Sequence, residues 1–343
     1  MKFVGLFALY PALKFQSDFH IATYTKSLEY FRKPREIRLR GIDIHSGERI
    51  IVRVKKASKS IKKKYFNELI FYKEGNWLLE FEFESEFPGR EKFKITRSDG
   101  HDESYTDKEL VEFWASVIPS FLDLDIQTYF FALNFSFPGA LHPVKSVWLV
   151  DEKLHHHSSS FHSMLEESID YLVKNGFIPD LNLEPESMIS WVFAQNGMLS
   201  GYSDTPASKA LNYCTRLFVR SIRNDEISDL VWALAGIEAL LVDGGRSSIG
   251  QLKNKLEALF RAHSNVKWLL ESIDRMYAFR SKMVHGNRQI RSVFRDDEED
   301  SSARSDEEYD AKRLAVGLLI ILIQRLVRSG QTKFDFELSC LNA

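Results

Sequence analysis

The chain has 343 residues, of which 44% are hydrophobic and 27% are charged. These fractions are typical of soluble globular proteins and exclude a collagen-like, low-complexity or largely disordered chain. The 46 lysines and arginines nearly balance the 48 aspartates and glutamates, so a nucleic-acid contact would have to come from a local patch. The two cysteines, Cys214 and Cys340, are too few for a disulfide framework, and we expect a reducing, cytoplasmic setting.

The first part of the chain is predicted to be rich in β-structure. Residues 1–10 favour a β-strand over a signal peptide, because they carry one basic residue and a proline follows them. Residues 37–44 and 50–54 flank a turn-forming segment and predict a hairpin. In Trp77–Glu84, apolar and acidic residues alternate, which predicts a strand with one buried and one solvated face. Shorter strands are expected at Phe93–Thr96 and Ser146–Val150, with a helix over Asp107–Leu122 between them.

Seven cations are concentrated in the segment Arg53–Lys64. The simplest interpretation is the edge of a hairpin that lysines protect from pairing with another chain. The segment could also follow an RNA backbone, in which case binding would depend strongly on salt. An anionic membrane surface or phage component is a third alternative.

From about residue 160 the apolar residues recur at helical spacing. Helices are predicted at 163–175 and 187–195, followed by a break rich in glycine, serine and proline near residue 200. We therefore expect an α+β protein. Its β-rich domain would cover residues 1–200, with a helical connector from about 160, and an all-α domain would cover residues 201–343. The helices of the second domain are predicted at 206–223, 226–242, 249–261, 266–285 and 306–328.

The longest apolar run, Leu314–Ile323, is about half as long as a membrane-spanning helix requires. It is predicted to be a buried core helix. The acidic stretch over residues 296–308 is expected to form a loop that leads into this last helix, where acidic residues suit the helix N-terminus.

The most informative stretch is the helix that ends at Gly286. It places Arg280 and His285 near its C-terminus as polar groups. A guanidinium group can grip phosphate oxygens, and an imidazole can move protons near neutral pH, so this pair suits phosphodiester chemistry. Apolar side chains at helical spacing are predicted to line a buried face: Ile273, Met276, Tyr277, Met283 and Val284.

The motif Arg280-Ser281-x3-His285 resembles the Arg-x4-6-His signature of HEPN domains, with the Apea-like branch the most similar. Upstream, Leu230–Leu241 resembles the glutamate-bearing helix of that family. Ser247–Leu252 resembles the opening of the family's next helix. The resemblance covers residues 206–330.

The resemblance implies an all-helical, dimeric HEPN domain that cleaves RNA without a metal, in a toxin or effector of antiviral, abortive-infection defence. It also implies catalytic roles for Arg280 and His285, with Ser281 as the polar residue after the arginine and Glu238 as an auxiliary acid. Neither a metal nor a cofactor is expected. The expected partners are RNA (tRNA, or phage or host mRNA), a second copy of the chain, and a phage-derived trigger or an antitoxin, with no membrane. Substrate contacts are expected from Arg275, Lys282, Arg246 and Asn287.

By this hypothesis His285 acts as general base or acid when an RNA 2′-hydroxyl attacks the adjacent phosphate, and Arg280 stabilises the charge that develops. A different class of function fits the same residues, namely a non-catalytic HEPN scaffold that dimerises and binds RNA or a partner protein. Arg280 and His285 would then be cations that favour a helix C-terminus. Glu238 could equally form a structural ion pair with Arg280 or Arg275.

Two other motifs are better explained by local structure. The run His155-His156-His157, with His162 nearby, could suggest zinc, but contiguous histidines lack the spacing of a structural zinc site. The stretch Asp243–Ser248 lacks the lysine of a phosphate-binding loop and is predicted to join two helices as a C-cap and an N-cap.

Overall fold

The structure is a computed structural model. It describes residues 2–10, 18–39, 50–64, 77–84, 95–96, 102–103, 106–151, 153–157, 165–195, 205–218, 226–242, 249–287 and 302–336. Contacts between Cα atoms divide the chain into two compact units. Unit 1 comprises residues 1–13, 24–130 and 141–162, and unit 2 comprises residues 14–23, 131–140 and 163–343.

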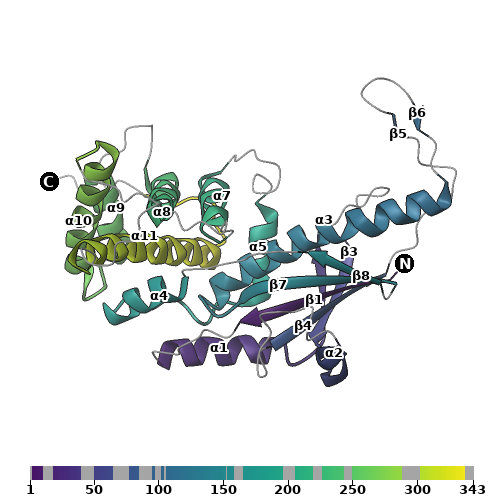
Figure 1. Ribbon diagram of the computed structural model, residues 1–343. Helices are drawn as coiled ribbons and strands as arrows, with labels where there is room; N and C mark the ends of the chain where they lie inside the picture. The colour runs from purple at the N-terminus through teal and green to yellow at the C-terminus, as the bar shows by residue number, and fades with distance from the viewer. Residues whose placement is uncertain are drawn as a thin grey trace. The chain divides into compact units, whose positions relative to one another are not determined.

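An antiparallel six-stranded sheet in the N-terminal part is followed by a largely helical C-terminal region, which confirms the α+β class (Figure 1). The strand order is β2-β3-β4-β1-β7-β8, and a separate pair joins β5 to β6. The strands are β1 (Lys2–Tyr10), β2 (Arg35–Leu39), β3 (Ile50–Lys56), β4 (Trp77–Glu84), β5 (Ile95–Thr96), β6 (Asp102–Glu103), β7 (His142–Val150) and β8 (Lys153–His157).

Helices α1 and α3 each contribute residues to both units, whereas α2 belongs to unit 1 and the later helices to unit 2. Among the described residues, no helix is both long and apolar enough to span a membrane. The helices are α1 (Asp18–Tyr30), α2 (Lys59–Lys64), α3 (Asp107–Ser136), α4 (Leu165–Lys174), α5 (Pro185–Ala194), α7 (Pro206–Phe218), α8 (Glu226–Leu241), α9 (Ile249–Phe260), α10 (Val266–Val284) and α11 (Ser302–Ser329).

One face of the sheet in unit 1 is aromatic. Phe7 of β1 packs edge-on against Phe81 of β4, with ring centroids 5.0 Å apart, and against Trp148 of β7. Phe130 of α3 contacts both phenylalanines, so the unit 1 part of this helix covers this face. Asp123 of α3 adds a polar anchor by accepting hydrogen bonds from the Ser146 hydroxyl (2.9 Å) and the Trp148 indole (3.4 Å).

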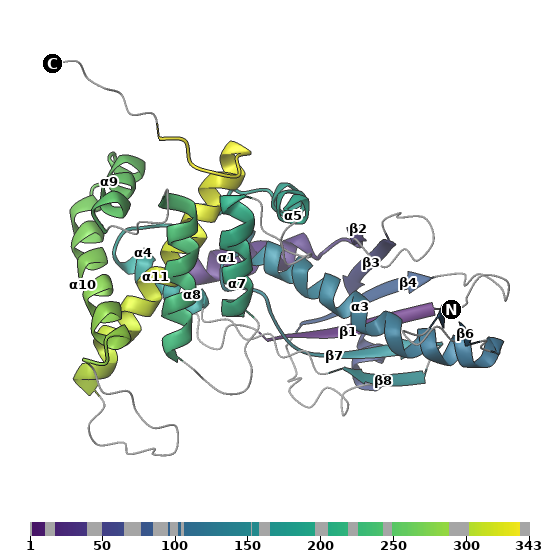
Figure 2. The ribbon, with the colours of Figure 1, turned by 90° about the horizontal axis from the view of Figure 1, so that it is seen from above.

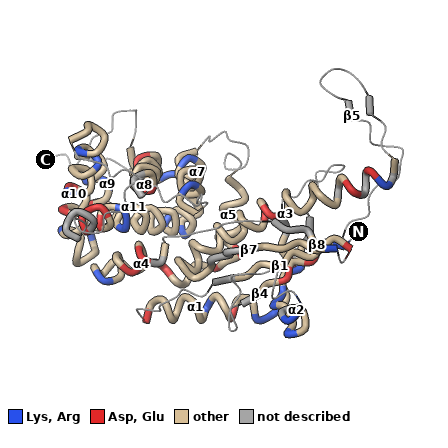
Figure 3. Tube along the Cα trace, viewed as in Figure 1, with Lys and Arg blue, Asp and Glu red and all other residues tan. Residues whose placement is uncertain are grey.

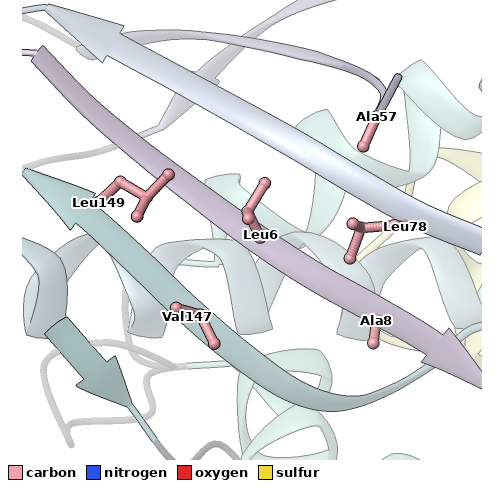
Figure 4. Close-up of a cluster of buried hydrophobic side chains, with 6 residues drawn as sticks. All are labelled: Leu6, Ala8, Ala57, Leu78, Val147 and Leu149. Carbon is pink, nitrogen blue, oxygen red and sulfur yellow. The ribbon is translucent and has the colours of Figure 1, made fainter. Parts of the chain in front are cut away.

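The opposite face of β4 is buried at Leu78 and Glu80, so the prediction of a solvated face for Trp77–Glu84 was wrong there. Beside it on β3, the Arg53 side chain, opposite Glu82, is 59% exposed. Glu80 is only 3% exposed, and its carboxylate lies 3.3 Å from the Lys55 ammonium. Burial raises the pKa of Glu80, because the charged form loses its hydration. Ile61 of α2 packs against an aliphatic cluster on this face, formed by Leu6, Ala8, Ala57, Leu78, Val147 and Leu149 (Figure 4).

The predicted hairpin over residues 37–54 is confirmed as β2 and β3, but its second strand is not an edge. β3 pairs with β2 on one side and with β4 on the other. The basic segment therefore turns from a central strand into α2, whose lysines Figure 3 shows in blue. The Lys55 ammonium is also not free, since it bonds to Glu82 at 2.8 Å.

Helix α11 is the central element of unit 2 and contacts α4, α8 and α10 (Figure 2). The apolar run Leu314–Ile323 is almost wholly buried, which confirms the core helix expected from its length. Gly317 lets α4 approach closely, because a Cβ atom there would lie 2.6 Å from a methyl carbon of Leu172. α11 begins at Ser302, before the end of the stretch predicted as an acidic loop.

The five helices predicted after residue 206 are found as α7 to α11, apart from residues 219–223, which lie outside the described part. The contacts also place α4 and α5 in unit 2, whereas the sequence analysis treated them as a connector in the first domain. All residues from 163 onward belong to unit 2, together with residues 14–23 and 131–140.

Candidate active site

Helix α10 and the three residues that follow it carry most of the predicted site residues. The α10 side chains Leu269, Ile273, Met276 and Met283 recur at helical spacing and are buried, which holds the helix against the rest of unit 2. Val284 was predicted to join this face but is 61% exposed. It is the last helical residue, about 100° around the axis from Met283, and no further turn covers it.

A polar cluster joins α10 to α8, and we define it as Glu238, Tyr277 and Arg280. The Tyr277 hydroxyl donates a hydrogen bond to Oε1 of Glu238 at 2.9 Å. Glu238 is half-buried in residues 230–241 of α8, which are otherwise apolar, so its carboxylate gains from a donor there. The Tyr277 hydroxyl is a partner that was not predicted from sequence, beside the predicted ion pair with Arg280 or Arg275.

The pKa of the Tyr277 phenol depends on its burial and on the charges of Glu238 and Arg280. Burial, and then the negative charge and hydrogen bond of Glu238, raise the pKa of Tyr277 far above its ordinary value, while the Arg280 charge lowers it. The phenol therefore stays protonated and remains a donor. Since Arg280 follows Tyr277 by three residues, the two side chains lie on one face of α10.

The C-terminus of α10 presents His285 to solvent. The Asn287 N–H donates to the Lys282 carbonyl at 2.8 Å and the Gly286 N–H to that of Met283 at 3.1 Å, with Gly286 at a φ of 68°. These bonds form a Schellman motif, which stops the helix with His285 as its C-cap. Ser281, Lys282, His285 and Asn287 are all exposed here, and Arg280 is half-buried.

The polar set is not confined to one face. Five helical residues turn the side chain by about 500°, so Arg280 and His285 point roughly 140° apart about the axis. The His285 backbone has left helical geometry, and its exposed side chain lies at the end of the helix that carries the half-buried Arg280.

Arg275 lies apart from this cluster. Its guanidinium donates to the Ser272 hydroxyl at 2.8 Å. Its charge acts on Tyr171 of α4 and Asp310 of α11, both of which have raised pKa values because of burial. Arg275 is therefore grouped with α4 and α11. Arg246, the remaining predicted substrate contact, lies outside the described residues.

Tyr277 is the member of the cluster for which no polar role was predicted from sequence. It was assigned to the apolar face because its ring fits the helical period, and the ring is indeed half-buried. A signal was present in the sequence, because a carboxylate in an apolar helix needs a donor and Tyr277 precedes Arg280 by one turn. Only the packing of α8 against α10 could show that this tyrosine is the donor.

Among the residues that the structure describes, no group of three His, Cys, Asp or Glu side chains could hold a metal ion. His155, His156 and His157 are consecutive residues of β8, and His162 lies outside the described part. The stretch 243–248 also lies outside it. No family model, curated protein or solved structure matches the chain.

Proposed function

We propose that the chain is a HEPN-type endoribonuclease with Arg280 and His285 as its catalytic residues. The observation that carries this proposal is the end of α10, where an exposed histidine closes a helix and a half-buried arginine precedes it by five residues. Tyr277 and Glu238 lie beside this arginine. The proposal that this ribonuclease activity serves a toxin or antiviral effector rests on the resemblance of Arg280-Ser281-x3-His285 to the HEPN signature.

The chemistry follows from the residue types. His285 takes the proton of a 2′-hydroxyl, whose oxygen then forms a bond to the adjacent phosphorus while the bond from phosphorus to the 5′-oxygen breaks. The leaving 5′-oxygen takes a proton from a histidine acting as acid, and the products are a 2′,3′-cyclic phosphate and a 5′-hydroxyl. Arg280 stabilises the added charge on the phosphoryl oxygens.

The remaining residues take supporting roles in this proposal. Glu238 and Tyr277, which a hydrogen bond joins, act as positioning residues in this proposal, since the charge of Arg280 acts on Tyr277. Ser281, Lys282 and Asn287 are exposed beside His285 and could contact the RNA backbone. Arg275, which the structure places with α4 and α11, would act on RNA only from a neighbouring surface.

The test is cleavage of total RNA in EDTA by purified wild type and by His285→Ala and Arg280→Ala variants, with the product ends mapped. We expect the wild type to leave cyclic-phosphate or 3′-phosphate ends. Loss of the general acid–base group should lower the rate by roughly 10² to 10⁴. Lys267→Ala is the matched control, since Lys267 is an exposed cation near the opposite end of the same helix.

Cleavage that persists at the wild-type rate in both variants would contradict the assignment of Arg280 and His285. Should no variant cleave RNA, growth arrest on expression in cells supplies the second readout. Arrest that both substitutions abolish supports the nuclease, and arrest that survives both favours the non-catalytic scaffold.

A further inference from the structure

Unit 2 contains a groove of about 820 Å³ that the candidate active site does not use. It lies among α9, the C-terminal end of α11 and the segment after α4. Volumes of about 300 to 1,000 Å³ are typical of small-molecule sites. The side chains that matter for its chemistry are two arginines of α11, Arg325 and Arg328, and a set of aromatic rings.

The two arginines differ in how their charge is balanced. The Arg328 guanidinium lies 2.9 Å from the Asp180 carboxylate. Arg325 donates to the Leu259 carbonyl at 2.6 Å and stacks over the Phe260 ring at 4.2 Å, and no carboxylate among the described residues pairs with it. The Arg325 side chain is exposed in the groove, and its partial desolvation, together with the repulsive charge of Arg328, lowers its pKa. An anion in the groove would relieve this repulsion.

The Arg325 fork is also held in place before any ligand arrives. Stacking on Phe260 and the bond to Leu259 fix the plane of the guanidinium, and its other nitrogen atoms have no partner among the described residues. A planar guanidinium can bind two oxygens of a phosphate at once. Such pre-ordering lowers the entropy that ligand binding would otherwise cost.

Apolar and aromatic surfaces form the other side of the groove. Phe334 and Phe336 are only half-buried, with ring centroids 6.2 Å apart, and Ile178 is 66% exposed. His263 completes the wall, because Nδ1 accepts from the Asn265 N–H at 3.2 Å and Nε2 donates to the Gly176 carbonyl at 3.0 Å. Both of its ring nitrogens are thus occupied, and His263 contributes a surface rather than a free polar group.

We propose that this groove binds an organic phosphate of nucleotide size, with the phosphate on Arg325 and a planar ring against Phe334 and Phe336. A half-exposed aromatic ring can stack on any nucleobase or similar planar heterocycle. The Arg325 guanidinium would bind the phosphate. The remaining charges of the groove are balanced, since Arg328 pairs with Asp180 and Asp335 pairs with Lys333 at 3.0 Å.

The site is separate from the candidate active site. His263 precedes α10 and His285 follows it, and a helix of 19 residues spans about 28 Å. A ligand in the groove therefore does not occupy the position of RNA at His285. The proposal does not depend on nuclease activity.

The test is isothermal titration of the full chain with AMP, with adenosine and inorganic phosphate as the two partial ligands. AMP should bind saturably and more tightly than either part. Arg325→Gln should weaken AMP roughly 10- to 100-fold, because a charge-assisted hydrogen-bonding group is lost. Arg325→Lys, which keeps the charge without the fork, should fall between the two.

Arg261→Gln is the matched control, since it removes an exposed cation next to Phe260 that does not line the groove. It should bind AMP as the wild type does. Thermal unfolding without ligand shows whether each variant is folded. Absence of saturable AMP binding, equal binding of AMP and adenosine, equal binding of AMP and phosphate, or unchanged binding in folded Arg325→Gln would each overturn the proposal.

Discussion

At the scale of single residues, the contact between Tyr277 and Glu238 links α10 to α8 through one hydrogen bond. A carboxylate in a partly apolar setting keeps its charge at lower cost when a donor is fixed beside it. The phenol is well suited to this task, because burial and Glu238 together hold it in the protonated form. Arg280 lies about one turn after Tyr277 on the same face of α10. The hydrogen bond between Tyr277 and Glu238 therefore fixes the part of the helix from which the Arg280 side chain extends.

Replacing Tyr277 by phenylalanine should lower the free energy of unfolding by about 1 to 2 kcal/mol, because Glu238 loses a donor while the ring packing is retained. Chemical denaturation at neutral pH measures the change. Tyr213→Phe is the control, since Tyr213 stacks on Trp232 at 5.9 Å through its ring. Its effect should stay within about 0.5 kcal/mol, and equal effects in both variants would contradict the role given to the Tyr277 hydroxyl.

The stability difference between wild type and Tyr277→Phe should decrease at high pH. The folded-state pKa of Tyr277 is raised above its ordinary value of 10.0. Its contribution is therefore complete below about pH 10 and is lost as the pH rises further. Above pH 10 the stability gap between wild type and Tyr277→Phe should narrow. Tyr24 and Tyr171 have pKa values raised in the same direction, and they remain in both proteins, so the difference isolates Tyr277.

At the scale of elements, the end of α10 is built by its last turn. Gly286 has a φ of 68°, which an L side chain rarely adopts, and it supplies the reversal that leaves His285 as the C-cap. Lys282 and His285 also suit this end of the helix because its carbonyls are negative. The local sequence thus creates the position from which His285 would act.

We predict opposite effects for two glycine substitutions that meet no neighbouring atom. A Cβ atom has nothing within 4 Å at either Gly286 or Gly250, so only the backbone differs. Gly286→Ala should cost about 1 to 2 kcal/mol because of its positive φ, whereas Gly250→Ala in the first turn of helix α9 should stabilise by about 0.4 to 1 kcal/mol. Thermal or urea unfolding measures both, and effects of the same sign would contradict this account of the α10 terminus.

At the scale of the whole molecule, the chain combines a sheet unit and a helical unit, and the proposed site lies in the second. The resemblance to HEPN domains implies a dimer in which two sets of Arg280 and His285 face one cleft. In that arrangement one histidine could act as base and the other as acid. A single chain would then lack half of the catalytic set.

Dilution should therefore lower the cleavage rate per chain in parallel with the dimer fraction. Sedimentation velocity gives the dimer fraction at each concentration, and RNA cleavage at the same concentrations gives the rate. A rate per chain that stays constant while monomer replaces dimer would contradict the shared cleft. Mixing folded His285→Ala with wild type is the control for dominant effects, and it should reduce activity more than simple dilution does.

Much of the architecture could be predicted from sequence. Strands β1 and β4 and helices α7 to α10 agree with the predicted elements to within a few residues, apart from residues 219–223 predicted for α7, which lie outside the described part. Their apolar residues follow a period of 2 or 3.6, and this signal can be read from local sequence without knowing how the elements pack. The elements that were missed have weaker patterns. Four of the six residues of α2 are lysine. β8 contains three histidines and forms because it pairs with β7 across a short turn.

The sequence by itself determined the α+β class, the order of most elements, and the placement of Arg280 and His285 at the end of one helix, because all of these depend on local spacing. Only the tertiary structure decided that Tyr277 is the donor to Glu238, that Glu80 is buried, that β3 is a central strand, and that Arg325 lies in a groove with Phe334 and Phe336. Each of these depends on segments far apart in the chain, and no local period encodes which of them will meet.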